Sequence, residues 1–273
     1  MKDLWKATFI RWNAEELLRV AARHYRAFLE LNDDKFFRKT TEFDIRSRQG
    51  LWHFWNTILP QCIQNSLGCH EHSAAYILRH TQLLPRQILY YFNQIAIINY
   101  EANGGWRTFD HASVVKGVEQ AENLICEEVF SAFGAVYPMA KELCEYVLPR
   151  FQPIMKYGDL HRIWNNCNTD GMGDKRTFPE FLKMLFDMGV MGEVIVGQNV
   201  MRDRPYIEGR FQCNSEGRIV VSEAANLCVH PIFSKFFNVR REAGEKRAVY
   251  PYGCELEQLP WPTDQLLGHV AAL

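Results

Sequence analysis

Residues 85–105 read PRQILYYFNQIAIINYEANGG and predict one long helix whose two ends are both marked. Proline is well tolerated in the first turn of a helix, so Pro85 marks the beginning. Gly104 marks the end, because glycine adopts the left-handed conformation of a helix C-terminus without steric cost. Apolar residues lie on nearly every face in between, which predicts burial among neighbouring helices. The segment therefore predicts a helical bundle built around it.

The chain before this segment carries further helix signals. Asn13 and Glu16 have the spacing of a capping box, and the apolar pattern that follows them continues to Leu31. Residues 32–41 are polar and show no periodicity, so we expect a break there. The other helices expected in this half are 49–64 with a kink at Pro60, 71–79, and 112–133 with Asp110 as its cap.

The pattern changes after Pro138, where shorter helices give way to β-branched and aromatic residues between turn signals. Residues 214–217 read NSEG and predict the turn of a β-hairpin. Three helices followed by a hairpin outline a winged helix. From Arg240 onward, dense charge and prolines predict an irregular tail. The expected elements are helices at 139–147, 159–166 and 179–188, strands at 193–197, 206–213 and 218–222, and a last helix at 232–237.

The predicted fold class is mainly α: a helical bundle domain followed by a winged-helix (α+β) domain and an irregular tail. The 273 residues are 47% hydrophobic, which supplies enough apolar material for one large or two small cores. The expected boundaries are 1–10 for an N-terminal extension, 11–137 for a helical lid-like domain, 138–239 for the winged-helix-like domain and 240–273 for the tail.

Composition restricts the partners and the compartment. The formal net charge of −1 argues against the broad basic surface of a nucleic-acid binder, so any contact with DNA must be local and weak. The longest apolar stretches are shorter than a membrane span, and the N-terminus lacks a secretory signal. The eight cysteines include no Cys-x-x-Cys pair, so we expect reduced, mostly buried thiols. A cytoplasmic protein with no membrane partner is expected.

Motifs for phosphate and metal binding are incomplete. Residues 171–177 contain two glycines but no adjacent Lys-Ser/Thr pair, so they do not form a phosphate loop. The first ligand positions of a calcium loop are matched at 166–171, but Thr177 stands where the closing glutamate is needed. Cys69, His70 and His72 lack a second pair of zinc ligands and are expected at a solvated helix N-terminus. We therefore predict no metal site and no catalytic residue.

His230 precedes Pro231 at the start of the last helix. No serine or cysteine nucleophile motif accompanies it, so it is expected to cap the helix or to lie in the core rather than to act as a base.

Residues 76–88 read YILRHTQLLPRQI and resemble the "His-Thr … Pro-Arg" junction in the helical lid of bacterial AAA+-like, STAND-type P-loop ATPases. In that family the junction lies beside the bound nucleotide, which implies a nucleotide-sensing role for Pro85 and Arg86. A proline-started helix also offers free amides and an arginine to a phosphate. A surface salt bridge of Arg86 is the alternative. The resemblance extends to residues 11–13 as the start of a lid, and to 185–192 and 229–233 as parts of a terminal winged helix.

The resemblance implies that ATP hydrolysis and its regulation lie in two different halves of the ATPase. The Walker A and Walker B half that would precede Arg11 is not in this sequence, so the chain in isolation is expected to hold no cofactor and to hydrolyse no ATP. ATP and Mg²⁺ would come with a P-loop half, in cis or in trans. The chain would then be the regulatory, non-hydrolytic half that couples nucleotide state to partner binding through the winged helix.

Two other functions stay open. A structural or interaction subunit of a multiprotein assembly, with other protein subunits as partners, fits the neutral charge and the many aromatic residues. A winged-helix DNA-binding regulator would need a basic recognition helix, yet residues 179–188 carry only Lys183 against Glu180 and Asp187.

Overall fold

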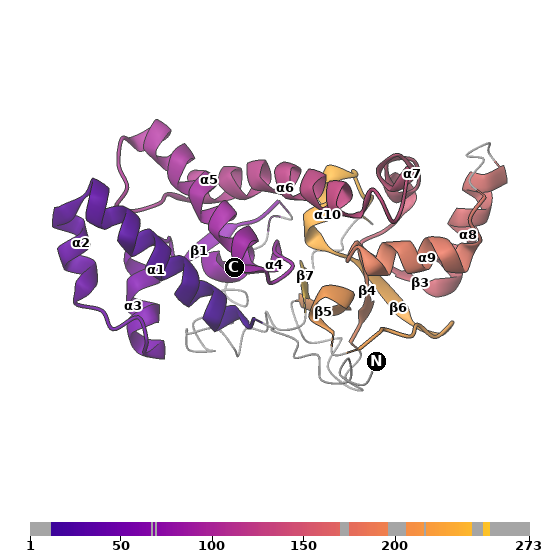
Figure 1. Cartoon of the computed structure of the whole chain (residues 1–273), viewed down its shortest axis with the longest axis horizontal. Helices are drawn as coiled ribbons and strands as arrows, with labels where there is room; N and C mark the ends of the chain where they lie inside the picture. Colours follow the sequence, from indigo (N-terminus) through magenta and orange to yellow (C-terminus); the bar gives the residue numbers. More distant parts are fainter. Residues whose placement is uncertain are drawn as a thin grey trace, which may run out of the picture.

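The structure is a computed structural model that describes residues 12–66, 68, 70–169, 175–195, 206–215, 217–241 and 248–251. Its N-terminal region is mainly helical, and its C-terminal region combines helices with one mixed sheet (Figure 1). This confirms the predicted order of a helical region followed by an α+β region. Within the described ranges, no helix is both long and apolar enough to cross a lipid bilayer.

Helix α1 (Ala14–Asn32) begins at the predicted capping box. The Asn13 side chain accepts a hydrogen bond from the Glu16 amide at 2.9 Å, and the Asn13 amide donates to the Glu16 carboxylate at 3.0 Å. These bonds satisfy amides that a helix leaves unpaired at its N-terminus. One face is buried, as its apolar spacing predicts, through Leu17, Leu18, Ala21, Tyr25 and Leu29.

Helices α5 (Pro85–Asn103) and α6 (His111–Phe133) form the centre of the helical region. Pro85 occupies the first turn of α5 and Gly104 ends it with a φ of 68°, as the sequence predicts. The Asp110 side chain caps α6 by accepting from the Ser113 amide at 2.6 Å. The two helices pack closely at Gly117, where an added Cβ would lie 2.7 Å from the Ile95 Cα. The prediction of a buried helix is confirmed for one side of α5 only, because Ile97 and Tyr100 on the other side are 43% and 46% exposed.

Two predictions in this region are wrong. The expected break at 32–41 contains helix α2 (Asp34–Thr41), because the Asp33 side chain caps it and Phe36 is buried against the core. The helix expected at 49–64 stops early, since residues before a proline are disfavoured in helical conformation: α3 (Arg48–Ile58) ends before Pro60. The chain then forms a short antiparallel pair, β1 (Cys62–Gln64) and β2 (His70–His72), before α4 (Ser73–Arg79).

The α+β region opens with three helices and a strand between the first two. The order is α7 (Ala140–Val147), β3 (Ile154–Lys156), α8 (Tyr157–Cys167) and α9 (Phe178–Asp187). After them come β4 (Met191–Val194), β5 (Tyr206–Phe211), β6 (Asn226–Val229), α10 (Pro231–Phe236) and β7 (Ala248–Pro251). The sheet order is β3-β6-β4-β5-β7, with β5 and β7 parallel and the other neighbours antiparallel.

The predicted hairpin at 206–222 is wrong. Strand β5 pairs with β4 and β7, and the next strand is β6 at Asn226–Val229, not 218–222. Residues 218–222 alternate like a strand, but they are exposed or half-buried, with Val220 84% exposed. Alternation alone therefore did not identify the segment that the sheet pairs.

The tail is not wholly irregular, because residues 248–251 form β7 and are buried throughout. Strand β7 depends on pairing with β5, which lies about forty residues earlier, and no local pattern announces such pairing. Residues 242–247 and 252–273 of the tail, the N-terminal extension, Arg11, Cys69, and residues 170–174 of the glycine-containing loop lie outside the described residues.

The two regions share one continuous hydrophobic core. Phe130 of α6 packs edge-on against Phe233 and Phe237, with ring centroids 6.0 and 5.4 Å apart. The Cys126 thiol also lies 3.2 Å from the Ile232 carbonyl oxygen. Helix α6 thus extends from the helical region to α10 (Figure 1), which places α4 and α6 beside α10 and β7.

Candidate functional site

The segment between α4 and α5 is fixed by two glutamines. The Gln87 side-chain oxygen accepts from the Gln82 amide at 2.7 Å, and the Gln87 side-chain nitrogen donates to the Gln82 side-chain oxygen at 3.3 Å. Between them, Leu83 has a φ of 55°, and its amide donates to the Thr81 hydroxyl at 3.2 Å. These bonds fix the path of the chain directly before Pro85.

The same segment contacts the α+β region. Gln82 Nε2 donates to the Met188 carbonyl at the end of α9, at 3.1 Å. The next residue, Gly189, has a φ of 70°, and a Cβ there would lie 2.6 Å from the same Gln82 nitrogen. Glycine is therefore required at 189 both for its conformation and for the close approach. A displacement of the segment would therefore disturb its contacts with the end of α9.

Pro85 and Arg86 lie where the sequence predicts them, in the first turn of α5. The Arg86 side chain is 80% exposed and forms an ion pair of 2.6 Å with Glu128 of α6, itself 45% exposed. This is the surface salt bridge that the sequence left open as an alternative. Exposed pairs of this kind contribute about 0–1 kcal/mol, so the arginine can exchange its partner at little cost.

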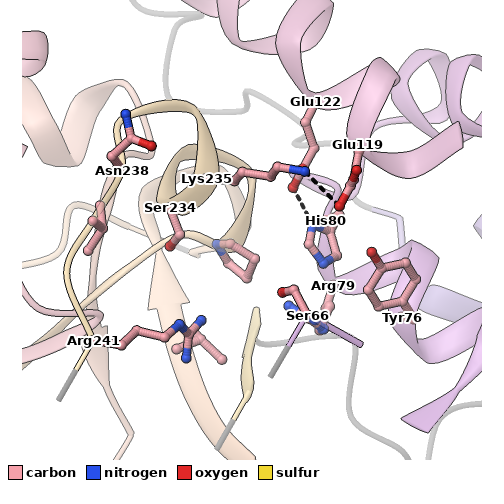
Figure 2. A pocket seen from close by; sticks show the side chains of 13 residues that line it. Ser66, Tyr76, Arg79, His80, Glu119, Glu122, Ser234, Lys235, Asn238 and Arg241 are labelled. Atoms are coloured by element: carbon pink, nitrogen blue, oxygen red, sulfur yellow. Dashed lines mark hydrogen bonds and ion pairs between the residues drawn. The ribbon is translucent and has the colours of Figure 1, made fainter. Parts of the chain in front are cut away.

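A cleft of about 410 Å³ lies between the two regions, and His80 lines it. The sequence did not predict this cleft. Its walls come from α4, α6, α10 and β7 (Figure 2). Most of its labelled side chains are polar or charged, although the floor is buried. Such a combination is unusual, because buried ionisable groups are costly unless each is paired.

Glu71, behind the cleft floor, is a buried carboxylate with several donors. Arg79 donates to it twice, at 2.8 and 2.9 Å, and Asn65 donates at 2.8 Å. The Tyr250 hydroxyl of β7 adds a fourth bond at 2.5 Å. Burial opposes the charge of Arg79, but Glu71 outweighs it and raises the pKa of Arg79 above its ordinary value. The network joins β7 to β2 and α4.

Glu122 of α6 contacts Nδ1 of His80, and here the carboxyl lacks an arginine bonded to it. Burial raises the pKa of Glu122 to about 8, although Arg79 and Lys235 oppose this. Burial and the nearby cations hold the pKa of His80 well below its ordinary value. The pair therefore shares one proton at neutral pH. We assign it to the Glu122 carboxyl, which donates to Nδ1 and leaves Nε2 of His80 as an N–H donor.

Two other histidines have structural roles. His230 is fully buried and caps α10 by accepting from the Ile232 amide at 3.3 Å, which confirms the predicted role. Burial lowers its pKa to about 3. His72 caps α4 through the Ala74 amide at 3.2 Å, but it is only 3% exposed, so the expected solvated N-terminus is wrong. Among the described residues, no group of three or more His, Cys, Asp or Glu side chains is placed to hold a metal ion.

Comparisons with known proteins give no relative. No protein-family model matches the chain. No curated protein and no solved structure matches it either. Two features of the structure therefore bear on function. One is the stretch from His80 to Gln87 between α4 and the first turn of α5, the His80–Gln87 segment, and the other is the cleft beside it.

Glu122 could have been found in the sequence. It lies four residues after Val118 and four before Cys126, on the apolar stripe of its helix. A carboxylate on such a stripe is either paired or protonated. Its partner His80 is forty-two residues away, and no spacing rule connects the two.

Proposed function

We propose that this chain is the lid and winged-helix part of a P-loop ATPase, in which the His80–Gln87 segment transmits nucleotide state to a partner-binding region. One observation carries the proposal: the two glutamines hold Arg86 at a defined position while Gln82 bonds the end of α9. A nucleotide contact at Arg86 and a movement of α9 are thereby linked mechanically. The resemblance of residues 76–88 to the lid junction points to the same place.

The chemistry at Arg86 suits a phosphate that is supplied by another domain. Its present partner, Glu128, is half exposed, so the ion pair is weak. A charge-assisted bond to a phosphate oxygen contributes about 1.5–3 kcal/mol, which exceeds that pair. ATP and Mg²⁺ would bind together with a P-loop half, which could belong to the same chain or to another chain. The assembly would lie in the cytoplasm. The chain in isolation would hold no cofactor.

The order of elements supports a winged helix for the second region. Helices α7, α8 and α9 accompany an antiparallel arrangement in which β6 lies between β3 and β4, and β3 stands between α7 and α8 in the chain. A winged helix has this arrangement of three helices and three strands. Strand β5, paired with the outer edge of β4, and β7 beyond it would be additions to that unit.

We infer that the partner of this region is a protein rather than DNA. Lys183 is the one basic residue in the sequence of α9. It forms an ion pair with Asp187 and donates to the Tyr137 hydroxyl at 2.9 Å. Its charge is therefore already compensated, and DNA affinity gained through α9 would be weak.

The test uses the chain assembled with the P-loop half that the proposal requires. Arg86→Ala should weaken ATP affinity or turnover by roughly 10-fold to 150-fold, the equivalent of one charge-assisted bond. Arg38→Ala is the matched control, because Arg38 is 78% exposed and forms a similar ion pair of 2.8 Å with Asp34. Thermal unfolding of the isolated chain should be nearly unchanged by either substitution.

Two results would contradict the proposal. If Arg86→Ala and Arg38→Ala leave the same nucleotide response, Arg86 is an ordinary surface residue and an interaction subunit becomes the better interpretation. If the isolated chain hydrolyses ATP, and a substitution in this chain abolishes that activity, the chain is not a non-hydrolytic half.

A further inference from the structure

The cleft between α4, α6, α10 and β7 presents more donors than acceptors. Three cations line it: Arg79 of α4, Lys235 of α10, and Arg241 in the segment that follows α10 (Figure 2). The carboxyls that line it are Glu119 and Glu122. Glu71 behind the floor compensates Arg79, and Glu119 pairs with Lys235. Because Glu122 is protonated at neutral pH by the argument above, the charge balance of the lining is still weakly positive. Such a lining attracts an anion.

His80 provides a separate indication of a ligand. It is 8% exposed, and its Nε2 has no hydrogen-bond partner within the part of the chain that the structure describes. A buried donor without an acceptor costs about 1–3 kcal/mol, so an acceptor that enters the cleft would recover that free energy. Glu122 holds the other ring nitrogen and so fixes the ring where it lines the cleft (Figure 2).

Lys235 can turn toward an anion without loss of the fold. It is 60% exposed and pairs with Glu119, 35% exposed, at 2.6 Å. Such a pair contributes little to stability. Ser234 and Asn238, on and just after α10, add uncharged polar groups to the same wall.

We propose that this cleft binds a small phosphate monoester, whose phosphate oxygens accept from His80 Nε2 and from Lys235. A phosphate offers three oxygens to donors that converge from α4 and α10, which a single carboxylate cannot match. The volume of about 410 Å³ lies within the range of sites for small organic ligands and exceeds what inorganic phosphate fills. The site is separate from Arg86 and requires no P-loop half.

The ligand would contact both regions at once. His80 follows α4 in the helical region, whereas Lys235 belongs to α10 in the α+β region. A phosphate bound between them would stabilise the packing of α10 against α6. Binding would therefore raise the melting temperature of the isolated chain, and the stabilisation would grow with the logarithm of the ratio of ligand concentration to dissociation constant.

The experiment is calorimetric titration of the isolated chain with AMP and with glucose 6-phosphate, with adenosine and glucose as unphosphorylated controls. We expect a phosphorylated probe to bind with a dissociation constant below about 1 mM. A preference for AMP identifies a nucleotide as the source of the phosphate, and a preference for glucose 6-phosphate identifies a sugar phosphate. Lys235→Ala should weaken binding roughly 10-fold. Lys183→Ala, which breaks a comparable surface pair outside the cleft, should not.

A second readout does not depend on a substitution. The ¹⁵N resonances of His80 should shift when the phosphorylated probe is added, and those of the buried His72 should not. The proposal is overturned if no probe binds at about 10 mM. It is equally overturned if adenosine binds as tightly as AMP, or if Lys235→Ala and Lys183→Ala bind alike.

Discussion

Glu71 and Glu122 are both buried, but they have different bonding partners. Glu71 accepts bonds from Arg79, Asn65 and Tyr250, so its charge is compensated. Glu122 contacts His80, a weaker base in this environment, and burial raises the pKa of Glu122 to about 8. Two glutamates in one cleft region therefore have different roles. One joins β7 to α4 as an ion, and the other orients an imidazole as an acid.

Loss of the Tyr250 hydroxyl should destabilise the fold. Tyr250→Phe removes one bond to the ionised Glu71, at a cost of about 1.5–3 kcal/mol in the free energy of unfolding. Urea unfolding measures it, with Tyr100→Phe as the control because Tyr100 is 46% exposed and stacks on Trp106. Equal stability of the two variants would show that the Glu71 network does not need Tyr250.

Glu122 should make stability depend on pH in a defined window. Its pKa is raised in the folded state, so the stability it contributes is present below the pKa of an unfolded glutamate and is lost as pH rises to about 8. Below about pH 6.5 the depressed pKa values of His72, His80 and His230 act in the opposite sense, because the unfolded chain takes up their protons. The contribution of Glu122 is therefore clearest between pH 6.5 and 8.

Glu122→Gln should abolish that dependence. Relative to the variant, the wild type should lose up to about 1.4 kcal/mol per pH unit across this window. Unfolding free energies at several pH values measure the difference, with the half-exposed Glu127→Gln as a control that should behave like the wild type. Arg79, Lys235 and Glu119 also act on Glu122, and all three remain in the variant. Parallel curves for the wild type and Glu122→Gln would show that Glu122 is ionised in the fold.

At the scale of elements, the contact between α5 and α6 depends on one glycine. Alanine normally favours a helix over glycine by about 1 kcal/mol. At Gly117, however, the new methyl would lie 2.7 Å from the Ile95 Cα, so the helices would have to separate. Gly117→Ala should therefore destabilise the protein by about 1–3 kcal/mol.

The matched control is Gly158→Ala in α8, where an added Cβ meets nothing within 4 Å. Thermal unfolding of both variants gives the comparison, and Gly158→Ala should be neutral or slightly stabilising. A stabilising Gly117→Ala would mean that α5 and α6 are not packed as closely as the structure shows.

Elements with local signals were predictable, and those that depend on distant pairing were not. The start of α1 follows from Asn13 and Glu16. The two ends of α5 follow from Pro85 and Gly104. Each of these residues lies within one turn of the helix end that it determines. Strand β7 forms because β5 lies beside it, and its own sequence could not show that. The candidate site divides in the same way. Arg86 was predictable from its proline, whereas the cleft requires α4, α6 and α10 to meet.

At the scale of the whole molecule, the balance of charge predicts weak binding to DNA. The chain is near electrical neutrality, and Lys183 of α9 is already paired. Binding to duplex DNA should therefore be weaker than about 1 µM at physiological salt and should weaken steeply as salt rises. Fluorescence anisotropy with a labelled duplex measures it. Tight, sequence-selective binding would favour the alternative of a DNA-binding regulator.

The central claim is that the His80–Gln87 segment carries nucleotide state from Arg86 to the end of α9, through Gln82 and the Met188 carbonyl. The most direct test is amide hydrogen exchange of the chain assembled with the proposed P-loop half, compared between ATP and ADP. The account predicts that exchange of residues 185–190 changes between the two nucleotides in the wild type and in Arg38→Ala, and that Arg86→Ala abolishes the change. Equal exchange of residues 185–190 with ATP and with ADP in the wild type would contradict it. A difference between ATP and ADP that is as large in Arg86→Ala as in the wild type would also contradict it.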